Sequence, residues 1–151
     1  MKLNEAKRYA KIQLGVNGLT NWKFRFDRTK LRVGHCDFSI KTITMSKPLF
    51  LLNSQTQFHD TLMHEIAHAI VGVGHGHDDV WKTKAVSLGC NGQRMAGNEV
   101  IQAPRTTILI CPNCKHESHR YKKSTKLACR DCCDKYNNGK FTERFIMKVK
   151  Q

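Results

Sequence analysis

The segment 64–68, which reads HEIAH, constrains this chain more than any other, because it places two metal-binding side chains within a helical apolar pattern. Residues four apart on a helix share a face, so the imidazoles of His64 and His68 can reach one ion. Glu65 follows the first histidine, where its carboxylate can activate water at that ion as a general base. Apolar flanks indicate a largely buried helix, in which unpaired histidines would be costly. This favours a zinc site over two surface histidines.

A third ligand is expected just downstream, because a catalytic zinc ion takes three protein ligands and keeps one position open. The glycine-rich segment after residue 71 allows a sharp reversal that would return a histidine beneath the helix. On spacing alone either His75 or His77 can serve. Asp78 and Asp79 remain as carboxylate alternatives.

Asp60 lies one helical turn before His64, on the same face. It can accept a hydrogen bond from a ligand imidazole and fix the tautomer of that ring. It can equally be an acid placed near a helix N-terminus, where it stabilises the helix dipole. The sequence alone leaves both roles open.

Periodicity around this helix predicts a small α+β unit. A first helix begins near Leu3 and is ended by the segment from Gly15 to Gly18, and alternation over 22–26 predicts a half-buried strand. Further strands at 31–36 and 40–45 would complete a small antiparallel sheet. The HEIAH helix is expected to begin at the capping box of 54–57.

A third helix is expected from about His77 to Gly89, and a boundary at Pro104. We therefore divide the chain into a domain of residues 1–104 and a domain of residues 105–151. A last strand is predicted over 141–149, where apolar and polar residues alternate.

Five of the seven cysteines lie between residues 111 and 133. Two CxxC pairs, separated by 14 residues, predict a structural zinc ion held by four thiolates, as in a zinc ribbon. Cys133 could replace the last ligand, and His116 or His119 are weaker substitutes; a redox CxxC is the rival interpretation. The remaining two cysteines, Cys36 and Cys90, are expected to be small buried hydrophobes. The four predicted ligands are Cys111, Cys114, Cys129 and Cys132.

The formal net charge of +14 indicates a polyanionic partner, nucleic acid before membrane, or else a solubilising surface. The second domain is the more basic, with 12 Lys/Arg against 4 Asp/Glu. Between its cysteine pairs Arg120, Lys122 and Lys123 surround Tyr121, a pattern typical of a surface that binds phosphates and stacks on bases. A solvated hairpin with a core-facing tyrosine is the alternative.

Residues 60–69, DTLMHEIAHA, resemble the active-site helix of the SprT-like family, which includes the Spartan-type proteases that degrade DNA–protein crosslinks. The acid four residues before the first histidine is part of this likeness. His77 followed by Trp81 resembles the third-ligand element of the family, so the resemblance selects His77 over His75. Segments 22–26 and 43–49 extend the likeness across most of the chain.

The resemblance implies a zincin-like helical metalloprotease core with catalytic zinc, followed by the zinc ribbon in which SprT-like proteins often end. It also implies zinc-dependent peptide hydrolysis, commonly linked to DNA. The gap between His68 and His77 is shorter than in the larger eukaryotic members, so the pocket rim is expected to differ. Without room for their partner-binding tails, the chain looks like a minimal bacterial- or phage-type member.

We therefore expect a zinc endopeptidase with two zinc ions, one catalytic and one structural, that acts on DNA-associated proteins. Single-stranded DNA is the favoured partner. No stretch is long and apolar enough to cross a bilayer and no secretory signal is recognised, so we expect a cytoplasmic monomer, with nucleoid association an option. One alternative is a non-catalytic zinc-ribbon protein that binds nucleic acid. The other is a protease of a regulatory protein such as a repressor.

Overall fold

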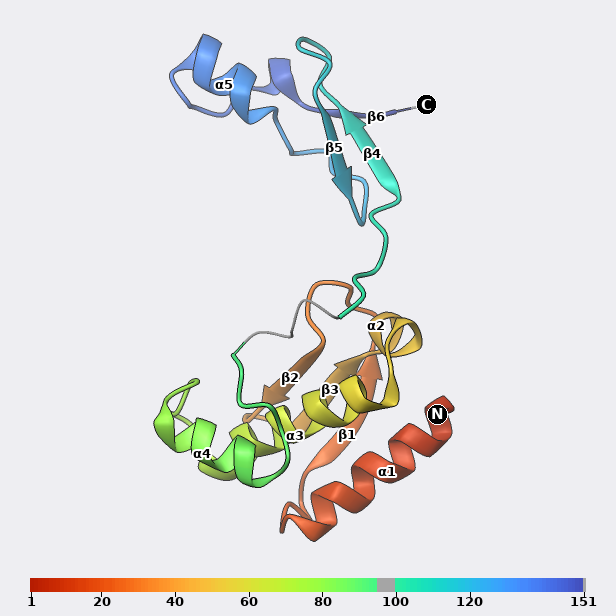
Figure 1. The fold of residues 1–151 in the computed structure, drawn as a ribbon. Helices are drawn as coiled ribbons and strands as arrows, with labels where there is room; N and C mark the ends of the chain where they lie inside the picture. Colours follow the sequence, from red (N-terminus) through yellow and green to blue (C-terminus); the bar gives the residue numbers. More distant parts are fainter. Residues whose placement is uncertain (95–99, 151) are drawn as a thin grey trace. The chain divides into compact units, whose positions relative to one another are not determined.

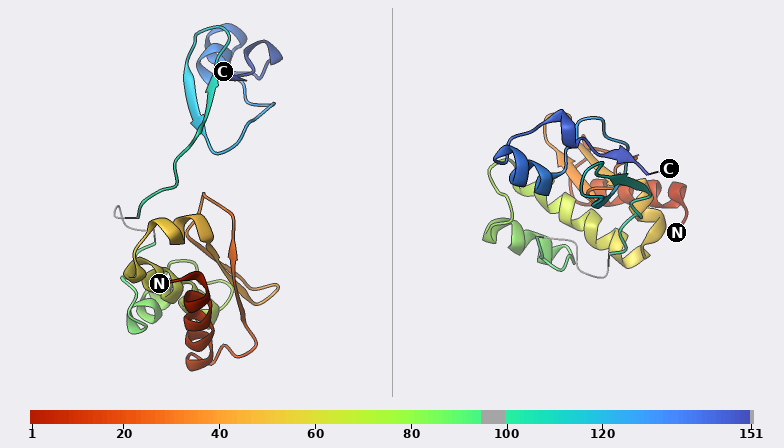
Figure 2. Two further views of the ribbon diagram at one scale, coloured as in Figure 1. Left: turned by 90° about the vertical axis from the view of Figure 1, so that its right-hand side faces the viewer. Right: turned by 90° about the horizontal axis from the view of Figure 1, so that it is seen from above.

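The computed structural model describes residues 1–94 and 100–150, which divide into two compact units, Met1–Ala103 and Pro104–Gln151 (Figures 1 and 2). Each unit has an apolar core of its own. Among the described residues, no helix combines the length and apolar character that a membrane span requires.

The first unit is an α+β fold, as the sequence predicted. Its sheet is mixed, however, with the strand order β1-β3-β2. β2 pairs antiparallel with β3, whereas β1 pairs parallel with β3. Its elements in chain order are α1 (Leu3–Val16), β1 (Lys23–Asp27), β2 (Gly34–Asp37), β3 (Thr42–Ser46), α2 (Lys47–Leu52), α3 (Gln55–Val71) and α4 (Asp79–Ser87).

The expected all-antiparallel sheet was therefore wrong in one pairing. The chain does reverse direction between successive strands, but β3 takes the central position that a simple meander would give to β2. All five residues of β3 are buried, as suits a strand with neighbours on both sides. As a consequence, β2 becomes an edge strand.

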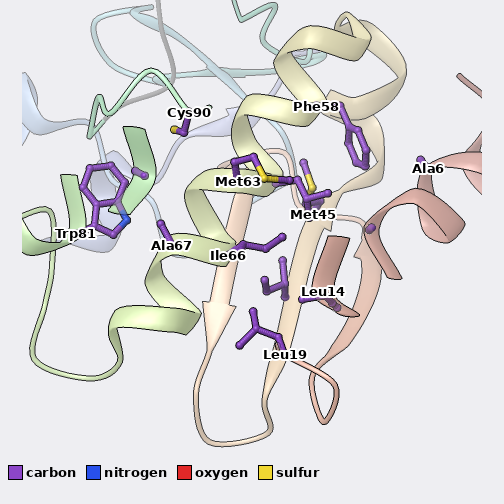
Figure 3. Close-up of a cluster of buried hydrophobic side chains, with 14 residues drawn as sticks. Ala6, Leu14, Leu19, Met45, Phe58, Met63, Ile66, Ala67, Trp81 and Cys90 are labelled. Atoms are coloured by element: carbon purple, nitrogen blue, oxygen red, sulfur yellow. The ribbon is translucent and has the colours of Figure 1, made fainter. Parts of the chain in front are cut away.

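Helix α3 is fixed between the sheet and α4 by the larger apolar cluster (Figure 3). Figures 1 and 2 show α1 and α3 on the same side of the sheet. Helix α3 contributes five residues to the cluster, spaced as an amphipathic helix requires. They are Phe58, Leu62, Met63, Ile66 and Ala67.

The capping box at the start of α3 is confirmed. Ser54 Oγ accepts a hydrogen bond from Gln57 N at 3.2 Å, and Gln57 Oε1 accepts one from Ser54 N at 2.8 Å. These bonds satisfy otherwise unpaired donors of the first turn. The start of α3 at the Ser54 cap and its buried apolar face together determine the direction in which its histidines project.

The second unit contains β4 (Thr107–Ile110), β5 (Glu117–Arg120), α5 (Arg130–Asn137), the 3₁₀ helix η1 (Glu143–Phe145) and β6 (Lys148–Val149). Its sheet has the order β5-β4-β6, with both pairings antiparallel. The strand expected over 141–149 is reduced to the two residues of β6. Thr142 Oγ1 accepts a hydrogen bond from Arg144 N at 3.4 Å, which begins the 3₁₀ turn and directs Phe145 into the core.

Candidate active site and second metal centre

Three histidines of the first unit converge on one point. The Nε2 atoms of His64 and His68 are 3.3 Å apart, and the Nε2 atom of His77 lies 3.0 Å from the first and 3.2 Å from the second. Nitrogen atoms about 2.0–2.1 Å from one tetrahedral ion are about 3.3 Å apart. The arrangement therefore fits a metal ion bound by three imidazoles.

The loop between α3 and α4 delivers His77 and leaves His75 outside this group. Helix α3 ends at Val71, and its C-cap Gly72 has a positive φ of 85° that turns the chain. His75 Nδ1 instead lies 2.8 Å from Asp78 Oδ2. The other oxygen of Asp78 caps α4 by accepting from Trp81 N at 2.9 Å, and Asp79 is exposed in the first turn of that helix.

Trp81 of α4 supports all three imidazoles from one side. It is 1% exposed, and its ring centroid lies 4.6, 5.1 and 4.5 Å from those of His64, His68 and His77. Its indole Nε1 donates a 3.4 Å hydrogen bond to the His64 carbonyl oxygen. Burial of this one side chain thus couples the position of α4 to the geometry of the site.

Backbone carbonyls hold the far sides of two imidazoles. A backbone hydrogen bond with Gln93 raises the pKa of the His64 ring, and one with His75 raises that of the His68 ring, which is the effect of a carbonyl that accepts from the ring. Because the Nε2 atoms face one another, these bonds fix the tautomer that carries its proton on Nδ1. Burial, followed by the neighbouring imidazoles, lowers the pKa of His64 and of His68 to about 4 each. Both rings are therefore neutral near pH 7, which is the form that binds metal.

Glu65 is buried beside this group, with 7% of its surface exposed. Burial raises its pKa to about 8, and the charge of Arg32 opposes the shift. Its carboxylate lies against Gly34 at the start of β2, where a Cβ atom would be 2.5 Å from Oε1. Sequence reasoning missed Gly34, because its importance depends on contact with a residue 31 positions away.

The histidines and Glu65 line a pocket of about 660 Å³. One wall comes from the edge strand β2, through Gly34, His35 and Cys36. Burial, followed by the Glu65 and Asp37 charges, raises the pKa of the Cys36 thiol to about 12. The pocket therefore places a metal-binding group, a buried carboxylate and a strand edge within reach of one bound chain.

Asp60 takes neither of the direct roles that the sequence left open, a hydrogen bond from a ligand imidazole or a charge in the first turn of the helix. It lies in the second turn of α3, beyond the first turn where the helix dipole acts most strongly. Its carboxylate oxygens accept hydrogen bonds from Asn91 N at 2.7 Å and Asn91 Nδ2 at 3.0 Å. The ring of His64 finds its partner at Gln93 instead.

The second unit brings together four cysteines. Their Sγ atoms lie within 4.8 Å of one another, with 3.8 Å between Cys111 and Cys132 and 3.6 Å between Cys114 and Cys129. Four sulfur atoms at about 2.3 Å from one tetrahedral ion are about 3.8 Å apart. The group therefore fits a closed metal site. Cys133 is not part of this group, although it is buried in the same apolar cluster.

The basic segment between the cysteine pairs begins at the end of β5 with Arg120, which is exposed. Lys122 and Lys123 are exposed as well, whereas Tyr121 is half-buried. The Arg105 guanidinium lies over the Tyr121 ring, 5.4 Å from its centroid. One face of that ring is therefore covered by a cation that the sequence analysis did not connect with it.

A three-histidine group beside a buried glutamate, on a small α+β unit, has the organisation of a metalloprotease. The chain belongs to the SprT-like family, whose model matches residues 5–102. The crystal structure of the metallopeptidase zymogen of Pyrococcus abyssi abylysin is 19% identical, covers 56% of this chain and 76% of that one, and has a TM-score of 0.43. A search of the curated proteins finds no match. Family membership confirms the resemblance stated from residues 60–69.

Proposed function

We propose that this protein is a zinc-dependent endopeptidase of the SprT-like type that cleaves DNA-associated proteins, in the manner of DNA–protein crosslink proteolysis. The observation that carries the proposal is the group of three imidazoles next to buried Glu65, open to a pocket of about 660 Å³. Residues 1–104 form the protease domain and residues 105–151 the zinc-ribbon domain.

Three imidazoles, His64, His68 and His77, hold the catalytic zinc. A bound zinc ion would polarise the scissile carbonyl and lower the pKa of water. Glu65 takes a proton from the attacking water and passes it to the leaving amine. Burial favours this transfer, because it raises the pKa of the Glu65 carboxyl and so makes its carboxylate a stronger base.

The substrate backbone lies extended along β2. That strand is an edge of its sheet and forms one wall of the pocket. An extended peptide can add to such an edge through main-chain hydrogen bonds, which select for an unfolded or flexible segment rather than for a sequence. Because Gly34 lies against Glu65, a peptide paired there would present its backbone next to the general base.

The direct test is cleavage of a basic DNA-binding protein by the full chain, with and without single-stranded DNA. Glu65→Gln is nearly isosteric and cannot act as a base, so cleavage should fall by about 10²-fold or more while zinc content is kept. Glu143→Gln, at an exposed glutamate of the second unit, is the matched control and should cleave like the wild type. Undiminished cleavage by Glu65→Gln would overturn the mechanism.

The zinc ribbon, held by its four cysteines, supplies the link to DNA. Arg120, Lys122 and Lys123 are exposed beside Tyr121, and Arg105 adds a fourth cation at that ring. Neutralised phosphates release counterions, so binding to single strands should weaken as salt rises, by about 0.7 units of log–log slope per contact. Replacing the three exposed cations should therefore flatten the slope by up to about two units.

Stacking of a base on Tyr121 would make a different contribution. Tyr121→Ala should weaken single-strand binding by about 1–3 kcal/mol with little change in the salt slope, because stacking releases no counterions. Since Arg105 covers one face of the ring, a base has to use the other face or displace that side chain. Binding undetectable at low salt would remove the DNA link and favour a regulatory substrate such as a repressor.

A non-catalytic nucleic-acid-binding protein is the alternative of another class. Buried Glu65 argues against it, because a purely structural site has no use for a carboxylate whose burial is costly. We place the protein in the cytoplasm as a monomer, where a reducing environment keeps the four cysteines available for metal.

A further inference from the structure

The carboxylate of Asp60, on α3, holds the loop that follows α4. Its two oxygens accept hydrogen bonds from Asn91 N at 2.7 Å and Asn91 Nδ2 at 3.0 Å. A side-chain hydrogen bond with Asp60 also raises the pKa of the Cys90 thiol, which is 4% exposed, as expected of a thiol that donates to the carboxylate. Three donors from two consecutive residues therefore anchor the loop at a point one helical turn before His64.

Asn91 links the Asp60 carboxylate to the next part of the loop, which lies beside the histidines. Its Oδ1 atom accepts a 2.8 Å hydrogen bond from Gln93 N. Gly92, between the two, has a φ of +69°, and a Cβ atom there would be 2.8 Å from Val86 Cγ2. The turn is thus pressed against α4 and its geometry is restricted. It ends with the backbone of Gln93 accepting the hydrogen bond from the ring of His64.

We propose that Asp60 is a positioning residue for the metal site, acting through Asn91 and the Gln93 carbonyl to fix the tautomer and orientation of His64. The inference rests on the metal site of the proposed function and adds the residue that prepares one of its ligands. His64 can bind metal through Nε2 only when the ring proton is on Nδ1, and the Gln93 carbonyl favours that tautomer. Loss of such an outer hydrogen bond typically lowers metal affinity by about 10–100-fold.

His68 provides an internal reference for this inference. Its ring is held by the backbone of His75, in the loop between α3 and α4, so the Asp60 hydrogen bonds do not reach it. A change at Asp60 should therefore alter the ring of His64 and leave that of His68 as it was. General loosening of the fold would affect both rings.

The test uses the full chain with Asp60→Asn, which keeps the side-chain shape. It replaces one of the two acceptor oxygens with an NH₂ donor, so one of the two hydrogen bonds from Asn91 is lost. Zinc affinity at the histidine site, measured by chelator competition, should weaken by about 10–100-fold. Nitrogen-15 NMR of the zinc-free protein should show the His64 ring changing from the Nδ1–H form to a mixture of tautomers, with His68 unchanged. Asn91→Ala, which keeps the main-chain bond to Asp60, is the second variant and should act in the same direction.

The matched control is Asn53→Ala. Asn53 also ties two distant segments together, through bonds from its Nδ2 atom to Leu49 O at 2.7 Å and Ile101 O at 2.9 Å, and from Ile101 N to its Oδ1 at 2.7 Å. Its loss should lower the free energy of unfolding without changing the His64 tautomer or zinc affinity. An equal effect in this control would show that Asp60 is merely structural, and would overturn the proposal.

Wild-type tautomer and zinc affinity in folded Asp60→Asn and Asn91→Ala would also overturn it. Failure of the proposed function looks different: the wild-type histidine site would bind no zinc, or Glu65→Gln would cleave normally. In that case the tautomers of the zinc-free protein still decide whether Asp60 orients His64.

Discussion

Gly34→Ala is the sharpest test of how the fold places Glu65. In the structure, a Cβ atom on Gly34 would lie 2.5 Å from Oε1, 2.9 Å from Cγ and 3.0 Å from Cδ of Glu65. Optimal contacts between non-bonded heavy atoms are about 3.5–4.0 Å, so the carboxylate has to retreat by about 1 Å. A misplacement of that size at the reacting centre can cost about 10²-fold in rate. Overpacking of a buried site costs about 1–3 kcal/mol of stability.

We therefore expect Gly34→Ala to lower kcat on a peptide substrate by about 10²-fold while zinc content stays close to that of the wild type. Activity, metal content and urea unfolding should be measured on one preparation. Gly15→Ala is the matched control, since a Cβ atom there meets nothing within 4 Å, and it should be stabilised by about 0.5–1 kcal/mol because it lies within α1.

A double-mutant cycle separates steric displacement of Glu65 from damage elsewhere. In the Glu65→Gln background, Gly34→Ala should cause little further loss of activity, because the group it displaces no longer acts as a base. Full additivity would mean that Gly34 serves the reaction through something other than Glu65. Wild-type kcat and stability in Gly34→Ala would refute the argument from close approach.

Three further predictions concern the metal groups. Metal analysis should return about two zinc equivalents per chain, falling to about one in His77→Ala and staying near two in His75→Ala; the reverse result would mean that the ligand assignment is wrong. Cys132→Ser should lose the structural zinc, whereas Cys133→Ser should keep it, and equal losses would contradict the grouping seen here. Trp81→Phe removes the donor to the His64 carbonyl, worth about 0.5–1.5 kcal/mol, and also part of a buried ring, so the loss of unfolding free energy in the zinc-free protein, measured by urea titration, should exceed that of the hydrogen bond alone.

What the sequence could predict were features set by local spacing. The capping box at Ser54, the apolar face of α3 and the two CxxC pairs are each contained within a short stretch of chain. A helix of known start and register already puts His64 and His68 on one face. The fold class and the family were therefore accessible without a structure, and both are confirmed.

What it could not predict were features that depend on which segments become neighbours. Alternation along a strand shows which face is buried but not which strand lies beside it, so the parallel pairing of β1 with β3 was missed. The role of Asp60 depends on Asn91, 31 residues away. The 141–149 segment alternates like a strand, yet packing of Phe145 into the core of the second unit and a 3₁₀ turn override that pattern.

The three candidate ligands differ in how far the fold prepares them. Trp81 supports all three rings, but only His64 and His68 project from a buried helix and have a backbone hydrogen bond that fixes the tautomer. His77 is exposed and follows a loop in which Gly72 and Gly74 both have positive φ. A metal ion that binds this site would find His64 and His68 already held in place. Most of the conformational entropy lost on binding would therefore come from His77. That loss is confined to the loop after α3, which carries His77. The loop after α4, which holds the ring of His64 through Gln93, would contribute to metal affinity as well.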